Sequence, residues 1–333
     1  MDWPLPIRVL LLPFSWIYGL AVCWKTLLYT AGIISRKRLN GAVISVGNLT
    51  VGGTGKTPMV MWLAEKFLSE GKRVAILSRG YRGERGTSDE IEMLKRRLGG
   101  KVRFGVGADR FAEGTKLEEA EPVDVFLLDD GFQHLALARD VDIVMLDGSK
   151  PLANEWLLPA GSLREPIRAC RRSDLLVVTR KFERPSIEAN DSHEHQLFYA
   201  QTRLLGFRRR GERPTPLYLS ETGPGPFFAF CGIGNPQAFF DDLKRWHVPL
   251  SGQQEYRDHH HYSSRDGDAL VALARNAGAT ALVTTEKDEQ NLADAGIEQM
   301  PVYIAVTDLV FSSESELVPA LERILKERRG KSL

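Results

Sequence analysis

The sequence predicts an α/β fold, in which a mostly parallel sheet carries helices on both faces and a smaller α/β unit follows. Short apolar runs of strand length alternate with helical patterns up to residue 179, which is typical of parallel sheets built from β–α–β units. A glycine-rich loop follows the first run directly, at the edge where such sheets place ligands. With 333 residues, 43% of them hydrophobic and 26% charged, the chain is long enough for two cores.

The strands of the first domain are expected where aliphatic residues run with little interruption. Continuous runs of this kind mark strands that are buried on both faces of a sheet. They lie at residues 42–46, 74–77, 102–104, 123–128, 141–146 and 175–179.

A second domain is expected because the pattern changes beyond residue 179, where a charged stretch, a strand-like run at 195–205 and an arginine-rich turn at 208–210 follow. We expect further strands at 227–231, 281–285 and 302–306, with helices at 236–246, 265–277 and 314–328. The predicted organisation is an apolar segment at 1–40, a core domain at 41–210, a smaller domain at 211–310 and a helix at 311–333 that packs back on the core.

The N-terminus carries an uncharged run of sixteen residues, 9–24. A membrane-spanning helix needs about 20 apolar residues, and Pro13 interrupts this run, so we predict a helix that lies in the membrane interface. A cleaved signal peptide is one alternative, although no small-x-small cleavage site clearly follows. A buried helix that packs on the sheet is the other.

Charge and cysteine content exclude several classes of function. The formal net charge is +1 and no long basic run occurs, so we expect no nucleic-acid partner. The three cysteines, Cys23, Cys170 and Cys231, are widely spaced, which argues against a disulfide framework and against structural zinc. A reducing cytosol fits this composition.

The glycine-rich loop reads as a cradle for nucleotide phosphates. Its glycines let backbone amides turn toward phosphate oxygens, while Lys56 reaches the β- and γ-phosphates and Thr57 offers a hydroxyl to Mg²⁺. A strict motif requires glycine at position 50, where this chain has Thr50. The alternative is a glycine turn without a ligand. The predicted cradle comprises Thr50, Val51, Gly52, Gly53, Thr54, Gly55, Lys56 and Thr57.

A second feature of the site is the apolar run that ends in Asp129 and Asp130. A carboxylate at the end of a strand beside such a loop is suited to hold Mg²⁺. Taken alone, a segment of this kind is more often a turn. It indicates a metal site only in combination with the glycine-rich loop. Together they favour nucleotide hydrolysis or phosphoryl transfer.

Several motifs in one order closely resemble the tetraacyldisaccharide 4'-kinases of lipid A biosynthesis, across nearly the whole chain. They are SVGNLTVGGTGKTP (45–58), LSRGY (77–81), DDGFQH (129–134), LLPAGSLREP (157–166) and DHH (258–260).

The resemblance implies a P-loop kinase that moves the γ-phosphoryl group of ATP to the 4'-hydroxyl of a tetraacylated glucosamine disaccharide 1-phosphate, giving lipid IVA. It implies ATP and Mg²⁺ as cofactors, with Asp129 or Asp130 on the metal. It also implies peripheral or monotopic attachment to the cytoplasmic face of the bacterial inner membrane. No obligate protein partner is evident.

The resemblance further implies a catalytic Asp–His pair that meets across the two domains, formed by Asp89 and His259. The family usually shows Gly-Asp-Glu-Pro where this chain has Ser88-Asp89-Glu90-Ile91. His260 is the alternative to His259, and an N-cap for the following helical pattern is the alternative role of Asp89. We expect the histidine run to be a solvated loop with one functional member rather than a zinc site.

A further group of residues is assigned by position to phosphate, ion-pair or disaccharide contacts. Fixing loop structure through backbone hydrogen bonds is an equally supported role for them. The group comprises Asn48, Arg79, Tyr81, His134, Arg164 and Glu165.

Two other classes of function remain open at this point. One is a P-loop regulatory ATPase or GTPase at the membrane without a small-molecule acceptor, and the other is a membrane adaptor that uses nucleotide structurally. Regulatory GTPases carry an Asn-Lys-x-Asp signature, and the nearest segment here, Thr285-Glu286-Lys287-Asp288, lacks the asparagine.

Overall fold

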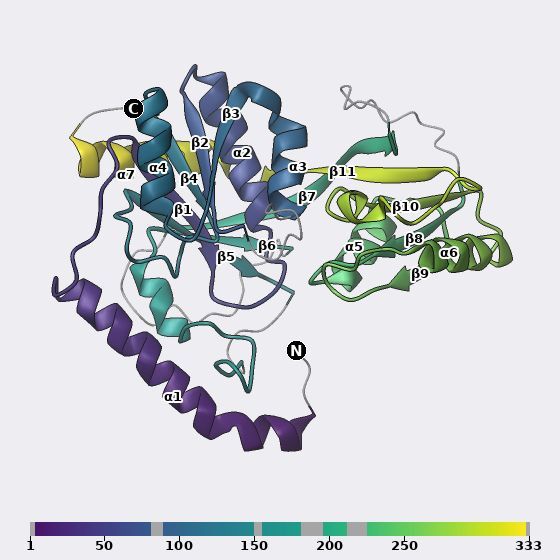
Figure 1. The fold of residues 1–333 in the computed structure, drawn as a ribbon, viewed down its shortest axis with the longest axis horizontal. Helices are drawn as coiled ribbons and strands as arrows, with labels where there is room; N and C mark the ends of the chain where they lie inside the picture. The colour runs from purple at the N-terminus through teal and green to yellow at the C-terminus, as the bar shows by residue number, and fades with distance from the viewer. Residues whose placement is uncertain (1–3, 81–88, 150–154, 181–195, 212–224, 331–333) are drawn as a thin grey trace. The chain divides into compact units, whose positions relative to one another are not determined.

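The computed structural model describes residues 4–80, 89–149, 155–180, 196–211 and 225–330. The chain forms two compact units. The first takes residues 1–80, 100–201 and 309–333, and the second takes residues 81–99 and 202–308. Figure 1 shows that each unit contains strands with helices beside them.

The first unit is built on a parallel sheet around β1 (Ala42–Asn48). β1 pairs in parallel with β4 (Val125–Asp129) and with β5 (Val141–Asp147). Every residue of these three strands is buried, as expected for strands covered on both faces. Val46 pairs with Asp129, so the glycine loop after β1 and the carboxylates after β4 leave the sheet at the same edge. The outer strands are β2 (Val74–Ser78), β3 (Val102–Val106), β6 (Leu175–Thr179) and the first part of β7 (Gln196–Arg209).

The helices of the first unit cover and anchor this sheet. The helix α4 packs Phe111 and Leu117 against a core cluster that contains Val43. The C-terminal helix is held by Arg329, whose Nη1 lies 3.0 Å from an Asp140 carboxylate oxygen and donates to the carbonyl of Gly41. The bounds are α2 (Lys56–Ser69), α4 (Arg110–Ala120), α7 (Glu314–Arg329) and the short 3-10 helix η2 (Ile167–Arg172).

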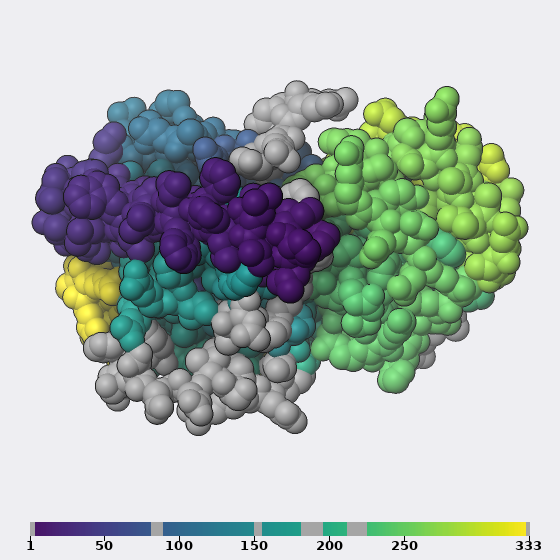
Figure 2. Space-filling model, turned by 90° about the horizontal axis from the view of Figure 1, so that it is seen from below, coloured from purple at the N-terminus to yellow at the C-terminus, as the bar shows by residue number. Residues whose placement is uncertain are grey.

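The N-terminal helix α1 (Leu5–Thr30) is longer than the sequence pattern indicated. It continues through Pro13 and through Lys25, so the expectation that proline interrupts the segment was wrong. By length and composition α1 is apolar enough to cross a membrane, and only 11% of its most apolar stretch is buried. Figures 1 and 2 show α1, in purple, lying lengthwise along the outside of the first unit.

The second unit has its own core and its own run of paired strands. The strands β11 (Val302–Phe311), β10, β8 and β9 pair in that order and run parallel to one another. A core of aromatic and aliphatic residues, including Phe230, Tyr262 and Ile304, fills the space beneath α6. The remaining bounds are β8 (Phe227–Cys231), β9 (Leu250–Glu255), β10 (Ala281–Thr285), α3 (Asp89–Leu98), α5 (Pro236–Arg245), α6 (Ser264–Asn276), and the 3-10 helices η1 (Gly99–Lys101) and η3 (Asp288–Leu292).

The helix α3 groups with the second unit, whereas the sequence placed all of residues 41–210 in one core domain. Arg97 forms an ion pair with Glu286 at 3.3 Å and donates to the carbonyl of Thr307. Arg96 forms a second ion pair with Glu289. These long-range contacts draw residues 89–98 to a part of the chain nearly two hundred positions away.

The expected fold class is confirmed, because the sheet is parallel at each pair that flanks β1, β2 and β6. The predicted strands occur with ends displaced by a few residues. The prediction omitted β9, whose sequence LSGQQE is mostly polar and only partly buried. A strand at the end of the sheet order needs less apolar surface, so hydrophobic pattern alone did not mark it.

Candidate functional site

The glycine-rich loop joins β1 to α2 and depends on glycine for its path. Gly52 has a φ of 125° and Gly55 a φ of 88°, values that other residues rarely adopt. A Cβ added to Gly53 would meet no atom within 4 Å. The space beside the loop at Gly53 is therefore open.

The N-terminus of α2 is open to an anion. Gly55 is the N-cap, and no side chain of the described residues caps this helix. Its first amides therefore keep their hydrogen-bonding capacity, and the helix dipole adds positive potential. The hydroxyl of Thr54, which can donate to an anion, is buried in the loop without a partner among the described residues. This arrangement fits a polyphosphate.

The loop at residues 157–166 packs directly on the phosphate loop, which the sequence did not reveal. The amide of Val51 donates to the carbonyl of Ser162 at 2.8 Å, and the amide of Arg164 donates to the carbonyl of Leu49 at 2.7 Å. Thr50 and Leu163 form an antiparallel bridge between them. Thr50, which departs from the strict motif, therefore lies where a neighbouring segment supports the loop.

Asp130 connects these two loops through charge. Its carboxylate accepts two hydrogen bonds from Arg164 Nη1, at 2.9 and 2.7 Å, and lies 3.6 Å from Lys56 Nζ. Burial raises the pKa of Asp130, but Lys56 and Arg164 outweigh this effect and hold the pKa below its ordinary value. Asp129, the last residue of β4, is 6% exposed. The structure thus brings Lys56, Asp130 and Arg164 together beside the phosphate loop.

His134 is held as a neutral imidazole. Burial, followed by the charges of Arg110 and Arg139, lowers its pKa to about 4. Arg110 Nη1 lies 3.1 Å from His134 Nδ1. Because a guanidinium only donates, Nδ1 accepts and the proton resides on Nε2. Sequence reasoning had not singled out Arg110, a buried cation at the start of α4.

Asn48 and Glu165 form hydrogen bonds with other residues of the protein. Glu165 is 3% exposed, and its carboxylate accepts from Arg172 at 2.7 and 3.0 Å and from Gln133 at 3.1 Å. Asn48 is fully buried, and its Nδ2 donates to the carbonyl of Gly52. These contacts support the loop-fixing role for both residues.

Two further assigned residues follow β2. Arg79 is exposed immediately beyond the end of this strand. Tyr81 lies outside the described residues.

The expected metal ligands do not amount to a multidentate cluster. Among the described residues there is no group of three or more histidine, cysteine, aspartate or glutamate side chains that could hold a metal ion. Thr57 lies in the first turn of α2, and Asp129 and Asp130 end β4. A hydroxyl and one or two carboxylates suit Mg²⁺, which takes few protein ligands and completes its shell with water and phosphate oxygens.

The second unit brings Asp89 and His259 together. His259 Nδ1 lies 2.9 Å from Asp89 Oδ2, and Asn291 Nδ2 donates to the same oxygen at 2.9 Å. The sequence assigned Asp89 to the core domain and His259 to the smaller one, whereas both residues group with the second unit by their contacts. His260 instead lies 3.3 Å from Asp266 and stacks on Tyr256. Asp89 is itself the first residue of α3 rather than its N-cap.

The pair polarises both of its members. Burial raises the pKa of Asp89, but hydrogen bonds from His259 and Asn291 outweigh burial and lower the pKa below its ordinary value. The hydrogen bond to Asp89 raises the pKa of His259 above its ordinary value, against the opposing effects of burial and Lys287. An ionised aspartate therefore orients an imidazole of increased basicity, which suits a general base.

Sequence reasoning missed residues that contact the site but lie far from it along the chain. Asn291 and Lys287 contact the Asp–His pair, and Tyr18 of α1 donates to the carbonyl of Arg164 at 2.9 Å. In the sequence, the segment with Lys287 shows only a partial likeness to a guanine signature. No local pattern marks Asn291 or Tyr18, because their partners lie far away in the sequence.

The first unit is a P-loop fold, since a parallel strand, a glycine loop and an uncapped helix N-terminus together form the phosphate cradle of that class. The model of the tetraacyldisaccharide-1-P 4'-kinase family matches residues 7–326. The chain belongs to this family.

Proteins similar to this chain match it over nearly its full length. The chain is 40% identical to a tetraacyldisaccharide 4'-kinase of Geobacter metallireducens, with 96% of this chain and 98% of that protein covered. It is 36% identical to the Geobacter sulfurreducens protein of the same name, with 95% and 93% covered. A crystal structure of LpxK from Aquifex aeolicus in complex with ATP matches with a TM-score of 0.74 and 30% identity, covering 96% of this chain and 99% of that one.

These matches confirm the resemblance to the kinase family, and the chain is an enzyme of the kinase class. They do not favour a regulatory ATPase or GTPase. The roles of individual site residues stay predictions.

Proposed function

We propose that this enzyme transfers the γ-phosphoryl group of ATP to the 4'-hydroxyl of tetraacyldisaccharide 1-phosphate, forming lipid IVA. The observation that carries the proposal is the phosphate loop with Lys56 and Asp130 beside an uncapped α2, in a chain that full-length relatives named tetraacyldisaccharide 4'-kinase match. Phosphoryl transfer requires mainly positioning and charge neutralisation. The loop amides and the Lys56 ammonium supply both at the phosphates.

The ATP site consists of the loop residues 50–57. Lys56 neutralises charge that develops on the β- and γ-phosphate oxygens, and Arg164 keeps Asp130 ionised beside it. Thr57 with Asp129 and Asp130 would hold Mg²⁺, which shields phosphate charge when bound. Arg79, exposed at the edge of the same sheet, is proposed to contact an anionic group of a substrate.

The acceptor hydroxyl needs a base, and His259 is the proposed one. Asp89 accepts from Nδ1 and so leaves the lone pair on Nε2. The hydroxyl proton passes to Nε2 as the oxygen bonds to phosphorus and the bond to the leaving ADP oxygen breaks. The neutral His134, with its proton on Nε2, is proposed to donate a hydrogen bond to a sugar oxygen.

The helix α1 is proposed to attach the enzyme to the cytoplasmic face of the inner membrane without crossing it. Contacts to the first unit come from Arg8, Ser15, Tyr18 and Lys25. Their spacing places them on one face of a helix. A helix held along its length by protein on one face has only the opposite face for lipid, which supports an interfacial position. Trp16 and Leu20 on that face are 73% and 71% exposed.

We predict that Trp16→Asp combined with Leu20→Asp reduces partitioning onto anionic phospholipid vesicles by at least about tenfold, because burying each side chain in lipid contributes about 1.5–3 kcal/mol. Sedimentation with vesicles measures the effect. Leu273→Asp, at an exposed leucine of α6, is the matched control and should bind as the parent does. Unchanged sedimentation of the double variant would refute attachment through this face.

The function itself is tested by transfer of labelled γ-phosphate to tetraacyldisaccharide 1-phosphate in detergent micelles. The expected product is a labelled lipid whose formation depends on both the lipid and the protein. ATP turnover that is equally fast with and without the lipid, and no labelled lipid, would instead favour a regulatory nucleotide hydrolase.

A further inference from the structure

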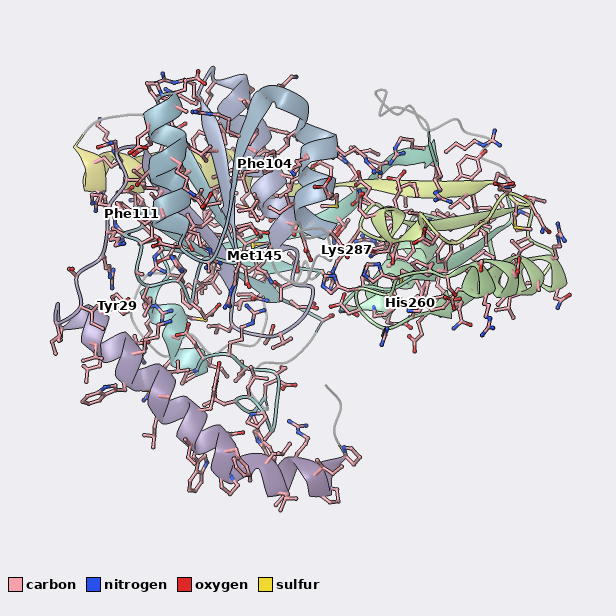
Figure 3. All side chains as sticks on the ribbon, in the orientation of Figure 1. Tyr29, Phe104, Phe111, Met145, His260 and Lys287 are labelled. Atoms are coloured by element: carbon pink, nitrogen blue, oxygen red, sulfur yellow. The ribbon has the colours of Figure 1, made fainter. Side chains whose placement is uncertain are left out.

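Lys287, labelled in Figure 3, lies between β10 and η3 in the second unit. Acceptors of the Asp–His site surround its ammonium group. Its Nζ is 3.3 Å from His259 Nε2, 3.1 Å from Asp258 Oδ1 and 3.2 Å from Glu90 Oε1. The side chain is 20% exposed. Burial lowers the pKa of Lys287, but Glu90 and Asp258 outweigh this effect and raise it, so the ammonium stays charged.

The hydrogen-bonding direction at His259 follows from its other nitrogen. Asp89 is ionised and can only accept, so Nδ1 carries a proton. In the neutral imidazole Nε2 then has the free lone pair, and Lys287, which can only donate, directs an N–H at it. The ammonium therefore occupies the same nitrogen that would accept the hydroxyl proton.

The charges around the His259 imidazole explain why its contact with Lys287 affects its protonation. Besides Asp89, the carboxylates of Glu90 and Asp258 lie 3.9 and 3.8 Å from Nε2. Among the described residues, Lys287 is the cation paired with these two groups. Without it, three carboxylates would face one imidazole and would favour the imidazolium, which cannot act as a base.

The segment that carries Lys287 is fixed by a buried network. Asp288 accepts from the amide of Gly232 at 2.7 Å and from Tyr262 Oη at 2.9 Å. The carbonyl of Gly232 accepts from the amide of His259 at 3.0 Å. One segment thus reaches the pair from both ends, through Asn291 at Asp89 and through Lys287 at His259.

We propose that Lys287 is a positioning residue of the Asp89–His259 pair, whose ammonium holds the Nε2 edge of the imidazole and keeps the ring neutral until the acceptor hydroxyl replaces it. In the transfer step the hydroxyl O–H bond breaks, its proton bonds to Nε2, and the ammonium remains with Glu90 and Asp258. The catalytic part of this inference rests on the proposed function. The charge state of His259 does not depend on it.

The test is Lys287→Met, which keeps most of the length of the side chain and removes its charge. In a ¹³C-histidine NMR titration without substrate, the pKa of His259 should rise by about one unit or more. In the transfer assay, kcat at neutral pH should fall by up to about tenfold, because at a pH below the pKa one pKa unit is a tenfold change in the neutral fraction. It should recover toward the parent value at higher pH, with KM for ATP unchanged.

Three further variants complete the design. Lys287→Arg keeps the charge and should retain a titration close to that of the parent. Lys95→Met, on α3 where Lys95 pairs with Glu92, is the matched control and should alter neither the titration nor kcat. Lys287→Gln replaces the methionine variant if that variant does not fold.

An unshifted His259 pKa in the neutral variants, or a loss of kcat that is equal at all pH values, would overturn the proposal. A shifted pKa in a protein that phosphorylates no lipid would support the electrostatic role of Lys287 and count against the proposed function alone.

Discussion

Lys56→Met is expected to lower kcat for lipid phosphorylation by about 10³-fold, the scale of losing a preorganised charge at a developing anion. Lys56 begins α2 at the phosphate loop, and its ammonium lies 3.6 Å from Asp130. The methionine side chain preserves the packing of the stem, and Arg164 still holds Asp130 in the variant. The loss should therefore appear in turnover rather than in stability.

The control is Lys66→Met on the same helix, where Lys66 pairs with Glu70 away from the loop. It removes an equal charge from α2 and should leave kcat and KM for ATP within about twofold of the parent. Labelled phosphate transfer at saturating ATP measures both variants, with thermal unfolding as the check on folding. Comparable turnover in the Lys56 variant and the control would exclude Lys56 from transition-state stabilisation.

His259→Asn is expected to lower kcat by about 10²–10⁴-fold, the usual contribution of a general base. Asparagine is the suitable replacement because His259 has a φ of 58°, a left-handed conformation that asparagine tolerates better than alanine. His261→Asn, at an exposed position of the same histidine run, is the matched control. The nucleotide affinity of the His259 variant should be unchanged, since the phosphate loop is intact.

Asp89→Asn tests whether the two residues act as a unit. The double variant with His259→Asn should be about as slow as His259→Asn alone, because an orienting carboxylate has no effect once the base is gone. Strictly multiplicative losses in kcat would separate their roles and contradict a shared function.

The pH dependence follows from the direction of the His259 shift. The base works as neutral imidazole, and Asp89 raises the pKa of His259 above its ordinary value of 6.5. The kcat of the parent should therefore fall as the pH drops through this raised pKa. In Asp89→Asn the acid limb of the profile should move to lower pH, because the stabilising carboxylate is absent, while the plateau falls.

Local sequence patterns predicted the parallel sheet, the phosphate loop and the carboxylates after β4. These features depend on neighbours in the chain: uninterrupted apolar residues form buried strands, and glycines at 52 and 55 permit the loop conformation. The polar strand β9 and the continuous helix through Pro13 escaped prediction. In both, contacts with the rest of the unit outweigh weak or opposing local preference.

The sequence by itself determined the class of fold, the phosphate cradle and the family, because each depends on motifs whose residues are neighbours in the chain. Only the tertiary structure decided that His259 rather than His260 meets Asp89, 170 positions away, and that both belong to the second unit. It also decided that Lys287 faces the imidazole. Such pairings depend on how helices and loops pack once the apolar core is buried, and no spacing along the chain records that geometry.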